Sequence, residues 1–239
     1  MGLVRNLSAD EILSQVVHGM RVVARDNMPP LNNVVFMGMG DAGRNIAQVQ
    51  LAVAALSDMK RFRLAASKIT VSTVGPSPDC FLQLAQTGAN IAWSLHSPDV
   101  VLRQKLIPSS RRHSPMELRD ALVHALIQTK PVRRRSVMIA TTLISGVNDS
   151  THDAERLAEF VLPMHEAGMS KVIIDIIPYN DIKVMPEFIA PTQKAVDAFQ
   201  NVLTARGLFC AVRESRGEED SAACGMLATE RIKKQRINL

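Results

Sequence analysis

The residue best placed to do chemistry in this sequence is a cysteine near the carboxyl terminus. Cys224 lies in the stretch ESRGEEDSAACGML, where alanine and glycine neighbours leave room for a substrate to reach its sulfur. The acidic residues at 218–220 would raise the pKa of this thiol if they lay close to it, which disfavours an ordinary thiolate nucleophile. Two interpretations of Cys224 therefore stay open: a reactive residue and a buried structural cysteine.

Several polar residues follow short apolar runs, where ligand-binding residues of α/β proteins gather. GMGD closes one run with Gly40 and Asp41, SLHS closes another with Ser94 and His96, and Asn180 follows a third. GMGD lacks the GxGxxG spacing of a dinucleotide site and the lysine of a phosphate-binding loop, so it indicates either a turn or a close backbone approach to a ligand. His96 is equally consistent with a ligand contact and with a hydrogen-bonded histidine at a strand end.

The sequence offers no metal-ligating pattern. Its six histidines lack paired spacing, and its three cysteines, at 80, 210 and 224, lie far apart. An odd number of widely separated cysteines also makes no disulfide framework, so we expect a reducing compartment. No apolar run approaches the roughly 20 residues that span a bilayer, and we expect no membrane partner.

Positive charge is concentrated in a few short stretches. The net charge is +5, and basic residues are dense at 109–114, 131–136 and 230–236. Such clusters favour a polyanionic partner such as RNA, although a solvated charged face gives the same pattern. A single Trp and a single Tyr disfavour an aromatic platform for stacking bases.

Apolar periodicity predicts alternating helices and strands throughout the chain. A capping box at 8–11 predicts a helix that ends near Arg25. Asn148 with Asp149 predicts a turn and the N-cap region of a later helix. We expect strands at 33–40, 68–75, 90–97, 136–146, 171–180 and 208–214, and further helices from after 41 to about 59 and at 78–88, 114–129, 150–168 and 191–207. This alternation predicts a parallel sheet with ligands at its carboxyl end, either in a whole or partial barrel or in an open doubly wound sheet.

Seven segments, in order, resemble one known family. The chain from Gly2 to about Ala228 is similar to the RlmN/Cfr family of radical-SAM adenine methyltransferases of 23S ribosomal RNA. The similarity is carried by RNLSADEILSQV, NVVFMGMGD, VSTVG, SLHSPDVVLRQKLIP, GVNDS, IIPYN and VRESRGEEDSAACGMLA.

The resemblance implies a fold, a chemistry and a set of site residues. It implies a partial (β/α)6 TIM-like barrel of radical-SAM type, in a single domain over 1–239, with a C-terminal extension at about 207–239. It also implies S-adenosylmethionine, a 4Fe–4S cluster, and an electron donor such as flavodoxin or ferredoxin. Cys224 would receive a methyl group and deliver its carbon to C2 of an adenine in ribosomal RNA, and possible substrates extend to tRNA. The residues implied for S-adenosylmethionine are Gly40, Asp41, Ser72, Ser94, Leu95, His96 and Asn180, and those for RNA are Arg111, Arg112, Arg213 and Arg216.

The sequence departs from the family pattern in its cysteines. The cluster motif CxxxCxxC has no counterpart among Cys80, Cys210 and Cys224, so we expect that this chain does not bind the cluster in the family's way. We also expect the first strand of the barrel to be missing, and Asp41 with Ala42 replaces the family's Glu-Pro. An inactive remnant that still binds S-adenosylmethionine or RNA is therefore the alternative. We expect a cytoplasmic protein, or one in an organelle with bacterial-type ribosomes.

Overall fold

The computed structural model describes residues 4–180 and 188–213. They form a curved β-sheet with a layer of helices on its outer side. All six strands of the described sheet are parallel and lie in chain order, from β1 to β6. The strands are β1 (Val34–Phe36), β2 (Ile69–Thr73), β3 (Asn90–Ser94), β4 (Ser136–Leu143), β5 (Lys171–Pro178) and β6 (Phe209–Val212). The helices are α1 (Ala9–Arg25), α2 (Ile46–Ser57), α3 (Pro78–Ala85), α4 (Val100–Leu106), α5 (Pro115–Thr129), α6 (Thr151–Glu166) and α7 (Gln193–Ala205).

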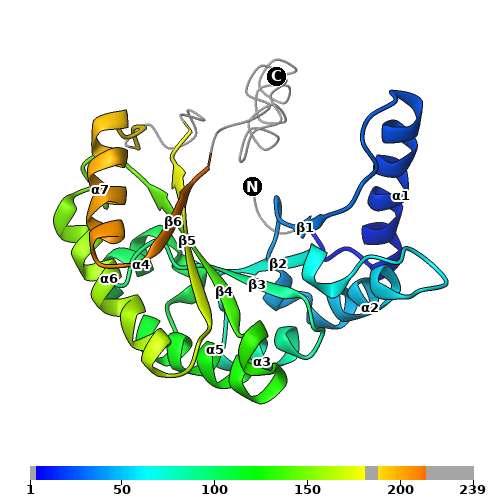
Figure 1. Cartoon of the computed structure of the whole chain (residues 1–239), viewed down its shortest axis with the longest axis horizontal. Helices are drawn as coiled ribbons and strands as arrows, with labels where there is room; N and C mark the ends of the chain where they lie inside the picture. Colours follow the sequence, from blue (N-terminus) through cyan, green and yellow to red (C-terminus); the bar gives the residue numbers. More distant parts are fainter. Residues whose placement is uncertain (1–3, 181–187, 214–239) are drawn as a thin grey trace.

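The strand order decides between the two architectures that the sequence left open. A doubly wound sheet reverses its strand order at a switch point, whereas strands in chain order are all connected in the same direction. Right-handed connections then place every helix on one side of the sheet. Figure 1 shows the helices around the outside of the curved sheet, as in a partial barrel, which confirms the predicted fold class.

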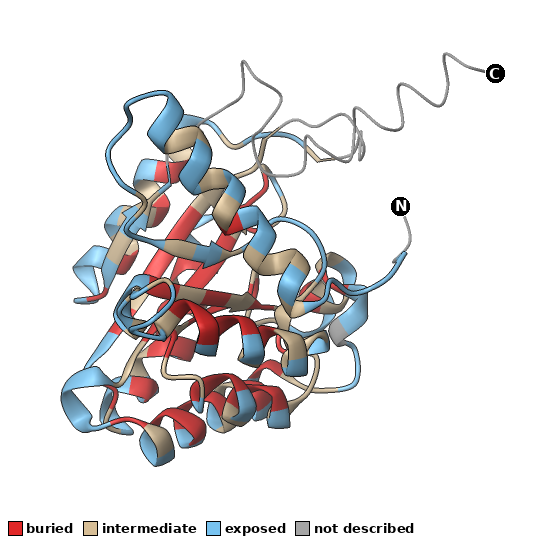
Figure 2. Cartoon of the chain, turned by 90° about the vertical axis from the view of Figure 1, so that its right-hand side faces the viewer, coloured by how far each residue is buried: buried red, intermediate tan, exposed pale blue. Residues whose placement is uncertain are grey.

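The main core lies between the sheet and these outer helices. Ile69, Val71 and Thr73 of β2 are buried while the residues between them are only partly buried, because successive side chains of a strand point to opposite faces. Figure 2 shows buried residues running along the strands and exposed residues on the outer faces of the helices. The inner face of the sheet is thus left to more polar side chains.

The sheet curls enough for two side chains that follow its opposite edge strands to meet. Arg213, directly after β6, places its Nη1 3.6 Å from the Sδ of Met37, directly after β1. β1 and β6 are the outermost strands of the described sheet, so this contact spans the inside of the curve. The described residues begin ahead of α1, and the expected loss of a preceding barrel strand remains a prediction.

The sequence analysis missed one element, helix α4. This helix has only seven residues, too few for a clear apolar period. Its start is fixed by Asp99, whose Oδ1 accepts a hydrogen bond from the Leu102 backbone N–H at 2.7 Å. Asp99 also pairs with Arg156 of α6 at 2.7 Å, which ties α4 to its neighbour. Tertiary contacts therefore support a helix that local sequence did not predict.

None of the helices in the described part of the chain has the length and the apolar character needed to cross a bilayer.

Candidate functional site at the carboxyl end of the sheet

The first part of the site is the glycine loop that follows β1. Gly38 and Gly40 have φ angles of +126° and +76°, a conformation that residues with a Cβ rarely adopt. A Cβ built on either glycine would meet no atom within 4 Å. Both glycines therefore border open space at the carboxyl end of the sheet, where a ligand can approach the backbone.

Asp41 is held at the end of the next strand. Its Oδ1 accepts from Thr73 Oγ1 at 2.8 Å, and its Oδ2 accepts from the Val74 backbone N–H at 2.7 Å. Gly43 packs so closely behind it that an added Cβ would lie 2.6 Å from Thr73 Oγ1 and 2.9 Å from Asp41 Oδ1. A carboxylate offers about four acceptor sites, so Asp41 can still accept from a cationic ligand.

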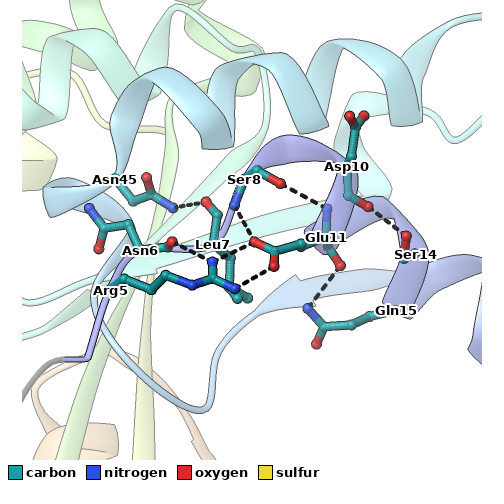
Figure 3. A network of polar contacts seen from close by, with 9 residues as sticks. All are labelled: Arg5, Asn6, Leu7, Ser8, Asp10, Glu11, Ser14, Gln15 and Asn45. Atoms are coloured by element: carbon teal, nitrogen blue, oxygen red, sulfur yellow. Dashed lines mark hydrogen bonds and ion pairs between the residues drawn. The ribbon is translucent and has the colours of Figure 1, made fainter.

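The segment before α1 is tied to this loop. Ser8 and Glu11 form the predicted capping box, and Glu11 also pairs with Arg5 at 2.6 Å. Figure 3 shows Asn45, next to the glycine loop, donating to the backbone oxygen of Leu7, a bond of 2.9 Å. Asn6 donates to the Arg44 backbone oxygen at 3.1 Å. Segments distant in sequence thus support the loop that carries Asp41.

Two serines line the inner face of the sheet. The hydroxyls of Ser72 on β2 and Ser94 on β3 lie 3.4 Å apart, and both side chains are partly buried. They point away from the helix-side core, because their strand neighbours Val71 and Trp93 are buried in it. The pair offers hydroxyl donors and acceptors to a ligand inside the curve.

His96 is fixed in its neutral form at the end of β3. It has a φ of +61°, and its Nδ1 accepts from the Thr142 backbone N–H at 3.0 Å. Burial, and secondarily the charge of Arg103, lowers the pKa of His96 to about 4. With Nδ1 as acceptor, the remaining proton lies on Nε2, which is a donor. The structure thus shows the hydrogen-bonded strand-end histidine that the sequence allowed.

Asn148 holds the ends of β3 and β4 together. It is buried, and its Nδ2 donates to the backbone oxygens of His96 at 2.9 Å and Thr142 at 2.8 Å, while its Oδ1 accepts from the Ile144 N–H at 2.8 Å. The sequence analysis predicted a turn and a helix N-cap region at Asn148 and Asp149, and residues 145–148 do form a turn. The helix cap is instead Ser150, which forms a capping box with Asp153.

Arg103 is a second organising residue that the sequence analysis missed. Its guanidinium is buried beneath the strand ends and donates to the backbone oxygens of Val74, Ser94 and Leu95. It also lies 5.5 Å from the ring centroid of Trp93, and its burial lowers its pKa to about 10. A cation that binds three carbonyl groups locks the loops after β2 and β3 in place.

An ion pair on the inner face joins the last two strands. Asp175 of β5 is buried and accepts from Arg213 Nη2. In the strand register, Asp175 lies beside Ala140 and Ala211, and Ala140 lies beside Ser94, so one row of the sheet runs from Ser94 to this pair. The sequence analysis did not single out Asp175. The available signal was one carboxylate inside the apolar run KVIIDII.

The structure brings together most of the residues that the resemblance implies. Gly40, Asp41, Ser72, Ser94 and His96 come from three neighbouring strands and meet at the carboxyl end of the sheet. Asn180 follows β5 at the same end and is partly buried. Leu95 contributes no exposed side chain, and its backbone N–H donates to Ala140 at 3.0 Å. Whether each residue binds a ligand remains a prediction.

The residues expected to contact RNA are only partly described. Arg111 and Arg112 are exposed, just beyond Ser109, whose backbone oxygen accepts from Arg44 Nη2 at 3.0 Å. Arg213 lies inside the curve of the sheet rather than on its outer surface. Cys224 and Arg216 lie outside the described residues, as does most of the C-terminal extension.

The described cysteines do not fit the ligation of an iron–sulfur cluster. Burial raises the pKa of Cys80 to about 12 and that of Cys210 to about 11, whereas cluster ligands are thiolates. Within residues 4–180 and 188–213, no group of three or more His, Cys, Asp or Glu side chains could hold a metal ion. The described residues therefore offer no site for such a cluster.

Comparisons with known proteins identify the chain's relatives. No established protein-family model matches it. It is 38% identical, over 229 residues, to a protein named a probable RNA methyltransferase of Rhodopirellula baltica, covering 95% of this chain and 57% of the relative. It is 33% identical, over 234 residues, to a probable dual-specificity RNA methyltransferase RlmN of a Thermotoga strain, covering 97% of this chain and 63% of the relative.

Solved structures agree with these relatives. A radical SAM methyltransferase from Sphaerobacter thermophilus superposes with a TM-score of 0.85 at 36% identity, over 95% of this chain and 63% of that one. A domain of pyruvate-formate lyase-activating enzyme from Bacteroides vulgatus, at a TM-score of 0.56 and 16% identity, shares the fold over 77% of this chain and all of that domain. The chain spans 57% and 63% of the lengths of the two curated relatives described above. Over nearly all of its own length, the chain is homologous to RNA methyltransferases of the RlmN type and to a radical SAM methyltransferase.

Proposed function

We propose that this chain binds S-adenosylmethionine at the carboxyl end of its sheet and serves in methylation of an adenine, at carbon C2, in 23S ribosomal RNA. The observation that carries the proposal is the convergence of Gly40, Asp41, Ser72, Ser94 and His96 at one end of β1 to β3. These residues come from separate segments of the sequence. Their meeting place is where ligands bind in parallel α/β folds.

The inner-face groups suit the amino-acid part of S-adenosylmethionine. Asp41 supplies a carboxylate for an ammonium group, and its orientation is set by Thr73 and the Val74 N–H. Ser72 and Ser94 supply hydroxyl groups, and neutral His96 supplies an Nε2–H donor without adding a positive charge next to a sulfonium. The glycines at 38 and 40 leave room for the ligand against the backbone.

In the proposed reaction, Cys224 accepts the methyl group first. A bond forms between Cys224 Sγ and the methyl carbon, the sulfonium S–CH3 bond breaks, and the thiol proton is released to solvent. S-adenosylhomocysteine leaves as the product. Phosphate groups of the RNA would pair with Arg111, Arg112 and Arg216, which brings an adenine to the methylated sulfur, whereas Arg213 is held by its ion pair with Asp175.

Mass spectrometry of the Cys224 peptide tests the proposal. The protein isolated from its native host should carry an additional methyl group on Cys224, and the Cys224→Ala variant should carry none on that peptide. Titration calorimetry should show S-adenosylmethionine binding that weakens in a Ser72→Ala, Ser94→Ala double variant. An unmethylated Cys224 together with wild-type affinity in the serine variant would refute the proposed site and its role.

The alternative is a non-catalytic protein that retains S-adenosylmethionine or RNA binding. It is favoured by one observation, the lack of a cluster-ligating set both in the described residues and in the spacing of the three cysteines. Deleting the gene discriminates the two. Loss of 2-methyladenine from the host's 23S ribosomal RNA supports the methyltransferase, whereas unchanged RNA with retained ligand binding supports the alternative.

The proposal extends to partners and location. The electron donor would be a small redox protein such as flavodoxin or ferredoxin, tRNA would be a second substrate to examine, and the compartment would be the cytoplasm. Affinity purification under reducing conditions and fractionation of host cells check these points.

A further inference from the structure

A strongly basic surface of the described chain lies at the opposite end of the sheet from the candidate site. The loop at 58–68 precedes β2 and the loop at 130–135 precedes β4, so both lie at the amino end of the parallel strands. Together the two loops contain eight cationic residues and one acid, an excess of seven, which is larger than the chain's net charge of +5. Six of these cations are exposed and define the amino-end basic surface: Lys60, Arg61, Arg63, Lys68, Arg133 and Arg134.

Specific hydrogen bonds hold the two loops in one surface. Asn90, at the start of β3, donates from Nδ2 to the Ser67 backbone oxygen at 2.9 Å. Lys130 donates from Nζ to the Ala89 backbone oxygen at 2.7 Å. The loops are thus both tied to the start of β3, and β2 and β4 lie two strand spacings apart, about 10 Å. This distance lets both loops contact one nucleic-acid strand.

Ion pairing does not account for this charge, although Arg63 Nε donates to the Met59 backbone oxygen at 2.7 Å. None of the six cations forms an ion pair within the part of the chain that the structure describes. Helices α2 and α5, which precede the two loops, carry no basic residue in their last turns, so these cations are not placed to complement helix dipoles. Burial, and secondarily the charge of Arg134, lowers the pKa of Lys130 to about 8. Mutual repulsion of this kind opposes folding and indicates a binding partner.

We infer that the amino-end basic surface binds the phosphate backbone of an RNA segment distant from the methylated adenine. The inference rests on the proposed function in one respect, that the macromolecular partner is RNA. Exposed Arg and Lys side chains without aromatic neighbours suit phosphate contacts rather than base stacking, and a duplex backbone presents phosphates at regular spacing. A large folded RNA can reach both ends of a small barrel, whereas a short substrate cannot.

A charge-matched pair of variants of the full 239-residue chain tests the inference. Arg61→Gln with Arg133→Gln removes two charges from the amino-end basic surface. Lys105→Gln with Lys194→Gln removes two exposed charges from α4 and α7, outside that surface. Fluorescence anisotropy with a labelled duplex RNA hairpin, over a series of salt concentrations, measures the affinity and its salt dependence.

The first double variant should bind about tenfold more weakly near 0.1 M salt, and the slope of log affinity against log salt should fall by about 1.8, as expected for two lost phosphate contacts on a duplex. The second double variant should match the wild type. Wild-type affinity and slope for RNA in the first variant would overturn the inference. If that variant keeps RNA affinity but loses affinity for an acidic protein such as flavodoxin, the surface binds protein and the inference is likewise overturned. Absence of RNA binding by the wild type would also overturn it.

The proposed function is judged separately. A third double variant, Arg111→Gln with Arg112→Gln, lies near the candidate site. If it weakens RNA binding while the amino-end variant does not, the further inference fails and the proposed function stands. Methylation of Cys224 is measured on each variant, so that failure of the chemistry is distinguished from failure of the distant contact.

Discussion

Replacement of Asn148 by alanine should both destabilise the protein and weaken the candidate site. The buried amide makes three hydrogen bonds, two as donor to the backbone oxygens of His96 and Thr142 and one as acceptor from the Ile144 N–H. No alanine atom can replace these bonds. Three backbone groups near the ends of β3 and β4 would lose a buried partner.

The expected cost follows from those three bonds. Leaving a buried backbone group unsatisfied costs about 1–3 kcal/mol, and partial access of water to a strand end puts these groups near the lower limit, so Asn148→Ala should lower the free energy of unfolding by about 3–4 kcal/mol. For a protein of this size, that corresponds to a fall in Tm of about 10 °C. The isosteric Asn148→Asp change should cost at least as much, because it replaces two donated bonds by a carboxylate facing two carbonyl oxygens.

Urea denaturation followed by circular dichroism measures this loss. Asn201→Ala is the matched control, since Asn201 is exposed on α7 and its replacement should change stability by less than about 0.5 kcal/mol. At a temperature where the Asn148→Ala protein is folded, calorimetry should show weaker S-adenosylmethionine binding, because His96 loses its anchor at a φ of +61°. A stability change below about 1 kcal/mol in Asn148→Ala would refute the reasoning.

Three further predictions concern other residues around the site. Gly43→Ala should lower stability by about 1–3 kcal/mol in denaturant titrations, since the new Cβ would lie 2.6 Å from Thr73 Oγ1; an unchanged midpoint would contradict it. The pKa of His96 is about 4 in the folded protein and about 6.5 in the unfolded chain. The contribution of neutral His96 to the free energy of unfolding should therefore be fully present above pH 6.5 and should fall by about 3 kcal/mol as the pH drops to 4. The His96→Gln variant should show a flatter pH dependence of stability. Arg213→Met should cost more stability than Asp175→Asn in thermal melts, because the carboxylate left behind is 7% exposed and the guanidinium is 40% exposed; the reverse order would refute the buried pair.

Local sequence was sufficient for most elements because their signals are strong. The six strands are apolar runs bounded by turns. The helix from Ala9 to Arg25 begins at its predicted capping box and ends where expected. Helix α4 was not predicted, because seven residues make a weak period and its cap depends on Asp99 also reaching Arg156. The turn predicted at Asn148 is present, but the hydrogen bonds of its side chain were not predicted, because their partners belong to two strand ends.

The sequence by itself determined the alternation of strands and helices, the glycine loop and the polar residues that follow strands, because these depend on neighbours along the chain. Only the tertiary structure decided which of those residues meet. Because the strands lie in chain order, every helix that connects them lies on the outer side of the sheet. Ser72, Ser94 and Asp175 therefore lie on the inner face, which none of the described helices covers. Contacts such as Arg213 with Met37, far apart in sequence, arise from the curvature of the sheet, which no local pattern encodes.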